Sequence, residues 1–243
     1  MSARITAATA LRVLAQIRHD PRTIALLLVV PSALMWLLQA MLGDVAFDRL
    51  GGPMLGMFPF ITMFLVASIA MLRERTTGTL ERLMTMPLSK LDLLAGYGIA
   101  FALLAAVQAL VASAVAFLAL GFDPAGPALL IAGLAVLDAV LGATLGLFAS
   151  AFASTEFQAV QFMPAFVLPQ ILLCGLLVPR DQMADGLAAV ASVLPLTFAF
   201  DALDAVAVQG ADLGGVIDEV TVLVCMSAAA VALAALTLRR RTA

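Results

Sequence analysis

Few residues in this sequence belong to types that carry out chemistry. Lys90 is the only lysine in 243 residues, and Ser89 precedes it where a P-loop has glycine. The chain therefore lacks the motif G-x-x-x-x-G-K-S/T and has no nucleotide-binding loop of that kind. The lone His19 offers too few ligands for a metal ion, and Cys174 and Cys225 each lie inside an apolar run. We predict that the chain is not an enzyme and itself binds no metal ion or cofactor.

Asp138 is the one ionisable residue that we place well inside an apolar run. A charge at the centre of a bilayer costs ~2.5–3.5 kcal/mol on insertion scales. We therefore expect the Asp138 carboxyl to be protonated, hydrogen-bonded or facing a wet cavity. A proton relay usually needs a chain of such groups, so a structural role is favoured over a proton site.

Residues 73–94 are the only polar stretch of the N-terminal half that long apolar runs flank on both sides. Apolar side chains recur there at spacings of three and four, which predicts an amphipathic helix: Leu80, Leu83, Met84, Leu88, Leu91 and Leu94. Pro87 ends the first part, and Ser89 with Asp92 forms a capping box that opens the next helix. Such a helix suits a surface on which a soluble partner acts, or one that lies on lipid headgroups. The periodicity alone leaves both interpretations open.

The composition is that of a membrane protein. Apolar residues make up 63% of the sequence and charged residues 12%, and the mean hydropathy is +1.11. A soluble domain is typically about 25% charged. We predict an all-α polytopic protein of the plasma (inner) membrane, in contact with membrane lipids and not with nucleic acid.

The distribution of charge predicts the topology. Eleven of the 13 Lys and Arg residues fall in four places: Arg4, Arg12, Arg18 and Arg22; Arg73 and Arg75; Arg82 and Lys90; Arg239, Arg240 and Arg241. Because basic residues favour the cytoplasmic side, both termini and residues 73–94 are predicted to be cytoplasmic. Ten of the 16 acids fall in the opposite loops: Asp44, Asp48, Asp123, Asp181, Asp185, Asp201, Asp204, Asp212, Asp218 and Glu219.

The apolar runs divide the chain into a single transmembrane domain, residues 1–243. It has six predicted helical spans, at residues 23–42, 54–72, 96–120, 129–152, 157–178 and 220–238. An amphipathic helix, residues 2–20, precedes them and ends at Asp20-Pro21. Residues 43–53 are predicted to be a short outer loop. Residues 179–219 are predicted to form one or two re-entrant or interfacial helices on the outer side.

Several residues inside the predicted spans bear on how the helices pack and where they could bend. Gly142 and Gly146 form a GxxxG pair, which permits close approach of another helix. Pro164 and Pro169 predict a bent fifth span, which suits a gate or central cavity, or only the shape of neighbouring helices. A candidate pathway for an apolar substrate consists of Phe58, Phe60, Phe64, Phe162, Phe166 and Leu172. Ordinary helix packing is the alternative explanation of these side chains.

Two stretches closely resemble the membrane subunits of type-2 ABC exporters. The first runs from Arg73 to Leu83 and continues with Pro87-Leu88-Ser89, combining charge, Gly, Thr and Pro at fixed offsets. The second comprises residues 174–179, Met183 and residues 194–203, and is similar to the outer re-entrant segment of that family. Two departures lie in this outer segment. The family often has Arg where Asp204 stands, and Pro where Ala184 stands.

The resemblance implies a half-transporter without an ATPase of its own. Two six-span subunits, forming a homodimer or a heterodimer, would sit on two separate ATPase subunits that bind ATP and Mg²⁺. Residues 77–86 would be the coupling helix, and residues 2–20 the connecting helix beside it. The expected ATPase-coupling residues are Arg75, Thr77, Gly78, Thr79, Leu80, Glu81, Arg82, Leu83 and Met84.

The resemblance also implies a class of substrate. The family exports drugs and antibiotics, lipids, and polysaccharides, and the similarity to short bacterial drug-efflux permeases favours an amphiphilic or hydrophobic drug-like substrate. Export of lipid or polysaccharide is one alternative. A secondary transporter that uses Asp138 as its proton site, and a membrane anchor that transports nothing, are the others.

Overall fold

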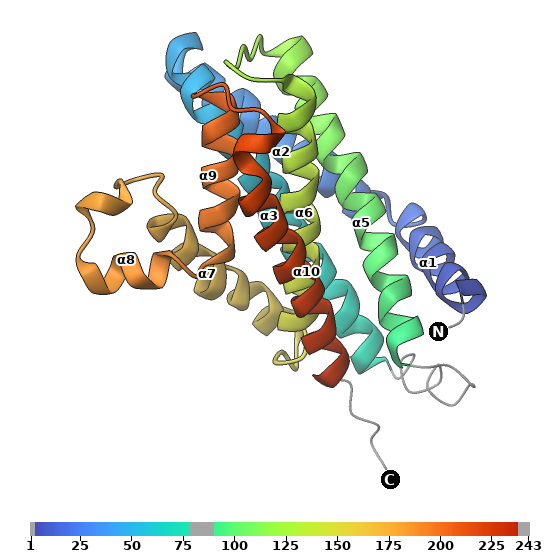
Figure 1. The fold of residues 1–243 in the computed structure, drawn as a ribbon. Coiled ribbons are helices and arrows are strands. Elements are labelled where there is room, and N and C mark those ends of the chain that lie inside the picture. The colour runs from blue at the N-terminus through green and yellow to red at the C-terminus, as the bar shows by residue number, and fades with distance from the viewer. Residues whose placement is uncertain (1–2, 78–89, 238–243) are drawn as a thin grey trace.

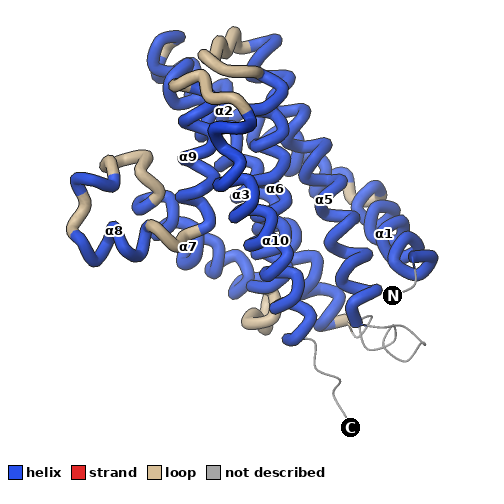
Figure 2. The backbone as a smooth tube through the Cα atoms, viewed as in Figure 1, coloured by secondary structure: helices blue, strands red, loops and turns tan. Residues whose placement is uncertain are grey.

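The computed structural model describes residues 3–77 and 90–237, which form helices joined by short turns (Figure 1, Figure 2). The longer helices are α1 (Ala3–Arg18), α2 (Pro21–Leu42), α3 (Asp44–Thr76), α5 (Lys90–Ala114), α6 (Ala128–Ala149), α7 (Glu156–Leu173), α8 (Asp185–Ala191), α9 (Pro195–Ala207) and α10 (Ile217–Thr237). Short helical turns accompany them: η1 (Val115–Ala119), η2 (Arg180–Gln182) and η3 (Leu213–Val216). No strand occurs in these two ranges, so the predicted all-α class is confirmed.

The predicted polytopic membrane character is also confirmed. Within the described residues, five helical stretches are long and apolar enough to cross a membrane: Pro21–Leu42, Asp44–Thr76, Asp92–Ala119, Ala128–Ala149 and Leu213–Thr237. Helices α8 and α9 add a sixth only if they are taken together, and they meet at an angle of 83°. An angle of this size is found in a broken span or in a re-entrant loop.

Helix α7 differs from the fifth span predicted at residues 157–178. It ends at Leu173 and runs through Pro164 and Pro169 as one helix. It is not among the five stretches apolar enough to cross a membrane, because glutamines and prolines lower its hydropathy. Whether α7 crosses the membrane stays a prediction.

The short outer loop predicted at residues 43–53 is wrong. Gly43 makes the whole turn with a φ of +70°, a value that glycine adopts readily, and α3 begins at the next residue. One side of the first turns of α3 is then buried, since the ring of Phe47 meets that of Phe122 with centroids 5.6 Å apart. Gly52 faces α9 so closely that a Cβ atom there would lie 2.4 Å from that of Ala207. Burial of this segment makes it part of a 33-residue helix.

Helix α3 is the centre of the bundle and packs against α2, α5, α6, α7 and α9. Its contact with α6 is the closest of these. A Cβ atom at Gly142 would lie 2.3 Å from the carbonyl oxygen of Phe60, and one at Gly146 would lie 2.3 Å from that of Phe64. The close approach predicted from the GxxxG pair is therefore confirmed, and α3 is the helix that approaches.

The region predicted to be re-entrant or interfacial, residues 179–219, holds α8 and α9. Helix α8 stands away from the bundle, whereas α9 packs between α3 and α10 (Figure 1). The first turn of α9 has no side-chain cap of its own, and the backbone N–H of Leu196 donates to Oε1 of Gln170 on α7 (3.3 Å). Arg180 forms an ion pair with Asp201 (2.8 Å) and ties the preceding turn to α9.

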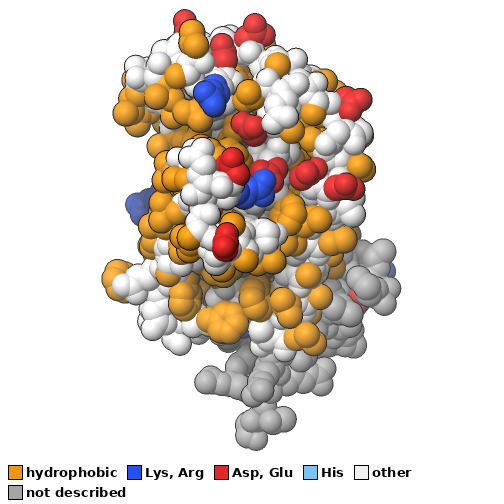
Figure 3. All heavy atoms as spheres, turned by 60° about the vertical axis from the view of Figure 1, so that its left-hand side comes forward, with side chains coloured by type: hydrophobic (Ala, Val, Ile, Leu, Met, Phe, Trp, Pro, Cys, Tyr) orange, Lys and Arg blue, Asp and Glu red, His pale blue; other side chains and the backbone are white. Residues whose placement is uncertain are grey.

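The two ends of the bundle differ in charge. Helices α3 and α10 end, and α5 begins, at the end that is lower in Figure 1. We call this the basic end, because the Arg73 and Arg75 side chains lie there. Acidic side chains gather in the upper half of the face shown in Figure 3. Which side of the membrane each end faces stays a prediction.

The contact between α3 and α6 predicts a sharp difference between two glycines of one helix. Gly142→Ala places a methyl group against the Phe60 carbonyl, and overpacking of this kind costs ~1–3 kcal/mol. Gly133→Ala is the matched control, because nothing lies within 4 Å of the added Cβ and alanine favours helix. We expect a lower thermal midpoint in detergent for Gly142→Ala only. Equal midpoints would contradict the packing described above.

Candidate functional site

The predicted ATPase-coupling residues begin where α3 ends. Gly78, Thr79, Leu80, Glu81, Arg82, Leu83 and Met84 lie outside the described residues. Arg75 and Thr77 are described. At the end of α3, the hydroxyl and the backbone N–H of Thr77 both donate to the Arg73 carbonyl, at 2.8 and 3.0 Å. The last turn of α3 thus lies within the predicted coupling segment, residues 73–94, and precedes residues 78–89, which lie outside the described residues. In the proposals below, these residues 78–89 are called the coupling segment.

Arg73 connects this last turn to α7. Its Nε and Nη2 atoms donate to the two carboxylate oxygens of Glu156, at 2.7 and 3.2 Å. Because Glu156 is the first residue of α7, the paired fork fixes the start of that helix against the end of α3. The arginine lowers the pKa of the Glu156 carboxyl below its ordinary value. Both side chains are about half exposed, so the pair contributes little stability, about 0–1 kcal/mol.

Glu74 connects the same turn to α1 and α5. Its Oε1 atom lies 3.1 Å from Nη1 of Arg12, and the glutamate is only 8% exposed. The second nitrogen of Arg12 donates to the hydroxyl of Tyr97, and the guanidinium also lies over the Tyr97 ring, 5.6 Å from its centroid. Since few charged groups are buried without a partner, Arg12 and Tyr97 make the position of Glu74 possible.

Arg75 connects the last turn of α3 to α10. Its Nη2 atom lies 3.4 Å from Oγ1 of Thr237, the last residue of α10. The three consecutive residues Arg73, Glu74 and Arg75 therefore contact α7, α1 with α5, and α10. We call these three residues the charged triplet.

The sequence-based choice of site residues missed most of this contact set. Only Arg75 of the triplet was assigned to coupling, and Arg12, Tyr97 and Glu156 were not assigned. The sequence signal that could have indicated these contacts was the charged triplet itself. Three charges in a row at the end of an apolar helix each require a partner, but the partners come from helices far apart in the sequence.

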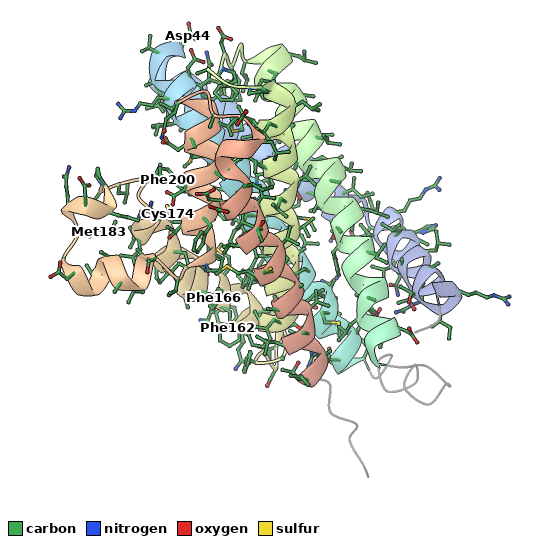
Figure 4. All side chains as sticks on the ribbon, viewed as in Figure 1. Asp44, Phe162, Phe166, Cys174, Met183 and Phe200 are labelled. Atoms are coloured by element: carbon green, nitrogen blue, oxygen red, sulfur yellow. The ribbon has the colours of Figure 1, made fainter. Side chains whose placement is uncertain are left out.

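Part of the predicted substrate pathway surrounds an apolar cavity of about 220 Å³. It lies between α6 and α7 and is lined by Leu145, Phe148, Ala149, Phe152, Phe162, Ala165 and Phe166. Phe162 and Phe166 both belong to α7 (Figure 4). Phe64 stacks on Phe166 with ring centroids 6.0 Å apart and an interplanar angle of 12°. The structure thus brings Phe64, Phe162 and Phe166 together, and adds Phe148 and Phe152, which the sequence analysis did not single out.

The other predicted pathway residues lie elsewhere. Phe60 is fully buried on α3, where its backbone meets Gly142. Phe58 is half-buried and packs on the core. Leu172 is 55% exposed, in the last turn of α7 and apart from the cavity lining. Ordinary packing accounts for Phe58 and Phe60.

Asp138 lies where α3, α6 and α9 meet and is 1% exposed. A Cβ atom at Gly56 would lie 2.3 Å from its Oδ2 atom and 2.3 Å from a methyl group of Leu203, so glycine makes room for the carboxyl. Its Oδ1 atom has no hydrogen-bonding partner among the described residues. Within residues 3–77 and 90–237, no three His, Cys, Asp or Glu side chains are placed to hold a metal ion.

Comparisons with known proteins agree with the resemblance found in the sequence. The probable multidrug ABC transporter permease YbhR of Escherichia coli K12 is 29% identical over 130 residues, which are 54% of this chain and 35% of that protein. The ABC transporter G family member 20 of Dictyostelium discoideum is 24% identical over 166 residues, 68% of this chain and 23% of that protein. The matched part therefore spans about a third or less of these relatives.

A match to a protein family covers most of the chain. Residues 6–207 match the family described as ABC-2 type transporter. The matched range begins in α1, includes the charged triplet and the cavity between α6 and α7, and ends with α9. This chain accordingly belongs to the ABC-2 type transporter family, as a membrane (permease) subunit.

Proposed function

We propose that this chain is the membrane half of an ATP-driven exporter, with the ATPase on separate subunits that hold ATP and Mg²⁺. The observation that carries the proposal is the charged triplet. It lies directly before the coupling segment, and each of its residues contacts a different part of the bundle. A force applied to residues 78–89 would therefore act on α1, α5, α7 and α10 at once.

The proposed mechanism is alternating access. Two copies of the chain, or one copy and a similar permease, would stand on two ATPase subunits at the basic end, in the cytoplasm. ATP binding would close the ATPases and displace the coupling segment, and α3 would pass the displacement to the start of α7. The complex would thus alternate between two packings of its helices. ATP favours one packing only to the extent that the ATPases bind ATP more tightly when the helices are in that packing.

The proposed substrate is an amphiphilic or apolar, drug-like molecule that leaves the cell. The cavity between α6 and α7 supports this, because its lining is apolar and aromatic and contains no charged side chain. Drug-binding pockets usually measure roughly 300–1,000 Å³, so about 220 Å³ would hold one part of such a molecule. The multidrug description of the Escherichia coli relative agrees with this class.

A proton-coupled carrier built on Asp138 has less support. A relay needs ionisable groups within hydrogen-bonding reach of one another. The Asp138 Oδ1 atom has no such partner in the described part of the chain, whereas Gly56 and Leu203 enclose the carboxyl.

The coupling segment provides the most direct test. The triple change Glu81→Ala, Arg82→Ala and Leu83→Ala removes its charges and one large apolar side chain. We expect substrate-stimulated ATP hydrolysis to fall to the basal rate and export to stop, with normal membrane insertion. Proteoliposomes containing the permease and its ATPase give both rates.

A matched control changes charge at the opposite end of the bundle. Asp218→Ala with Glu219→Ala alters the exposed start of α10, and stimulation and export are expected to persist. Unchanged stimulation and export in the triple variant would refute coupling through this segment.

The charged triplet predicts unequal effects of neighbouring charges. Glu74→Gln leaves Arg12 without its partner near the protein interior, where breaking a buried pair costs ~3–5 kcal/mol and a partly exposed one less. Arg73→Gln breaks an exposed pair worth about 0–1 kcal/mol. We expect the larger fall in thermal midpoint for Glu74→Gln, and partial recovery when Arg12→Met is added. The same small shift in both single variants would contradict the described network.

The aromatic cavity predicts a local effect on ligand binding. Phe166→Ala removes a ring that lines the cavity and stacks on Phe64, and an aromatic contact is worth ~0.5–1.5 kcal/mol beyond its area. We expect about tenfold weaker binding of rhodamine 6G, measured by fluorescence anisotropy in detergent. Leu172→Ala, on the same helix but outside the cavity, is the control. Equal Kd values for all three proteins would exclude the cavity as the binding site.

A further inference from the structure

A second and larger hollow lies at the basic end, between α1, α2 and α3. It is a groove of about 460 Å³, and none of its residues lines the aromatic cavity. Its wall is apolar toward the middle of the bundle and charged nearer the basic end. On α3, Leu65 and Ile69 come first and Arg73 follows one turn later, nearer the basic end. On α2, Leu26 likewise lies toward the middle of the bundle, and Arg22 lies one turn nearer the basic end.

Among the described residues that line the groove, Arg22 is the cation without an ion-pair partner. Asp20 accepts hydrogen bonds from the backbone N–H groups of Arg22 and Thr23 (3.2 Å each) and from the Thr23 hydroxyl (2.7 Å), so its charge caps α2. Arg73 is paired with Glu156, as described above. The Arg22 side chain is exposed and forms no ion pair with any described residue.

We propose that this groove binds a membrane phospholipid, with the phosphate at Arg22 and an acyl chain along Leu26, Leu65 and Ile69. Guanidinium groups bind phosphate through paired N–H donors. The apolar wall continues from this group toward the middle of the bundle, which is the direction in which the acyl chains of a lipid at the basic end extend.

The position of α1 agrees with this occupant. Amphipathic helices lie at the level of the lipid headgroups, and basic pockets between helices on the cytoplasmic side bind anionic headgroups. The apolar face of α1 contributes Val13 and Ile17 to the groove. A free phosphate ion would leave this apolar wall unused, and an uncharged apolar molecule would leave Arg22 unused.

The bound lipid has a structural consequence. Glu74 and Tyr97, which hold Arg12 of α1, also line the groove. A lipid would therefore fill the space beside the contact between α1 and the charged triplet. Because it binds only the folded chain, it would raise the thermal midpoint in proportion to the logarithm of its concentration.

The test measures binding and does not depend on transport. The full chain is purified in mild detergent and titrated with phosphatidylglycerol, and the lipid-bound species are counted by native mass spectrometry. Arg22→Gln is expected to raise the Kd for phosphatidylglycerol about tenfold. Arg18→Gln, which removes a charge from the same end but outside the groove, is the control and should stay within about twofold of the wild type.

A second variant separates shape from charge. Ile69→Trp fills the apolar part of the groove and leaves Arg22 in place, so it should also weaken lipid binding. Gel filtration and the thermal midpoint confirm that each variant is folded. If this variant and Arg22→Gln both bind lipid like the wild type, the proposal is wrong.

Two further ligands separate the lipid from its parts. Inorganic phosphate and diacylglycerol are each expected to leave the thermal midpoint unchanged at concentrations where phosphatidylglycerol raises it. Stabilisation by phosphate alone would show an ion site, and stabilisation by diacylglycerol alone would show a purely apolar groove. An equal loss of affinity for phosphatidylglycerol in Arg18→Gln and Arg22→Gln would show that basic charge in general attracts the lipid. Each of these three results would overturn the proposal.

Discussion

The contact of two glycines of α6 with the backbone of α3 is the constraint on which the rest of the bundle depends. At Gly142 and Gly146 the two helices approach until no Cβ atom fits between them, and the carbonyl oxygens of Phe60 and Phe64 take up the space. In a membrane, where apolar side chains gain little by leaving lipid, association depends on such packing. This contact holds α3 along the bundle axis, and α2, α5, α7 and α9 also pack against α3.

In the proposed function, α3 would carry a displacement of the short polar stretch to several other helices. The charged triplet is the last part of α3 before the coupling segment, and its partners belong to four other helices. The individual bonds differ in strength, because Glu74 is buried whereas Arg73 and Glu156 are exposed. The arrangement therefore combines one firm connection, to α1 and α5, with one that breaks and re-forms easily, to α7.

The sequence predicted features that are local and missed those that several helices build together. Asp20-Pro21 was correctly identified as a helix boundary, since Asp20 caps α2 and Pro21 is its first residue. Residues 43–53 were predicted to be a loop, but this segment is helical and packs closely against α9 and Phe122. Phe148 and Phe152 gave no signal of their own, because only the fold brings the end of α6 and the following turn to the cavity that they line with Phe162.

The hydrogen bond between Gln170 and Leu196 restricts how α7 and α9 can move relative to each other. The first turn of α9 begins with Pro195, which has no N–H, and the next N–H depends on a side chain of α7. If α9 separated from α7, this donor would be left without an acceptor in an apolar environment, at a cost of several kcal/mol. The two helices are therefore expected to travel as one rigid unit. Any opening between helices would then form along the border of that unit and not between α7 and α9.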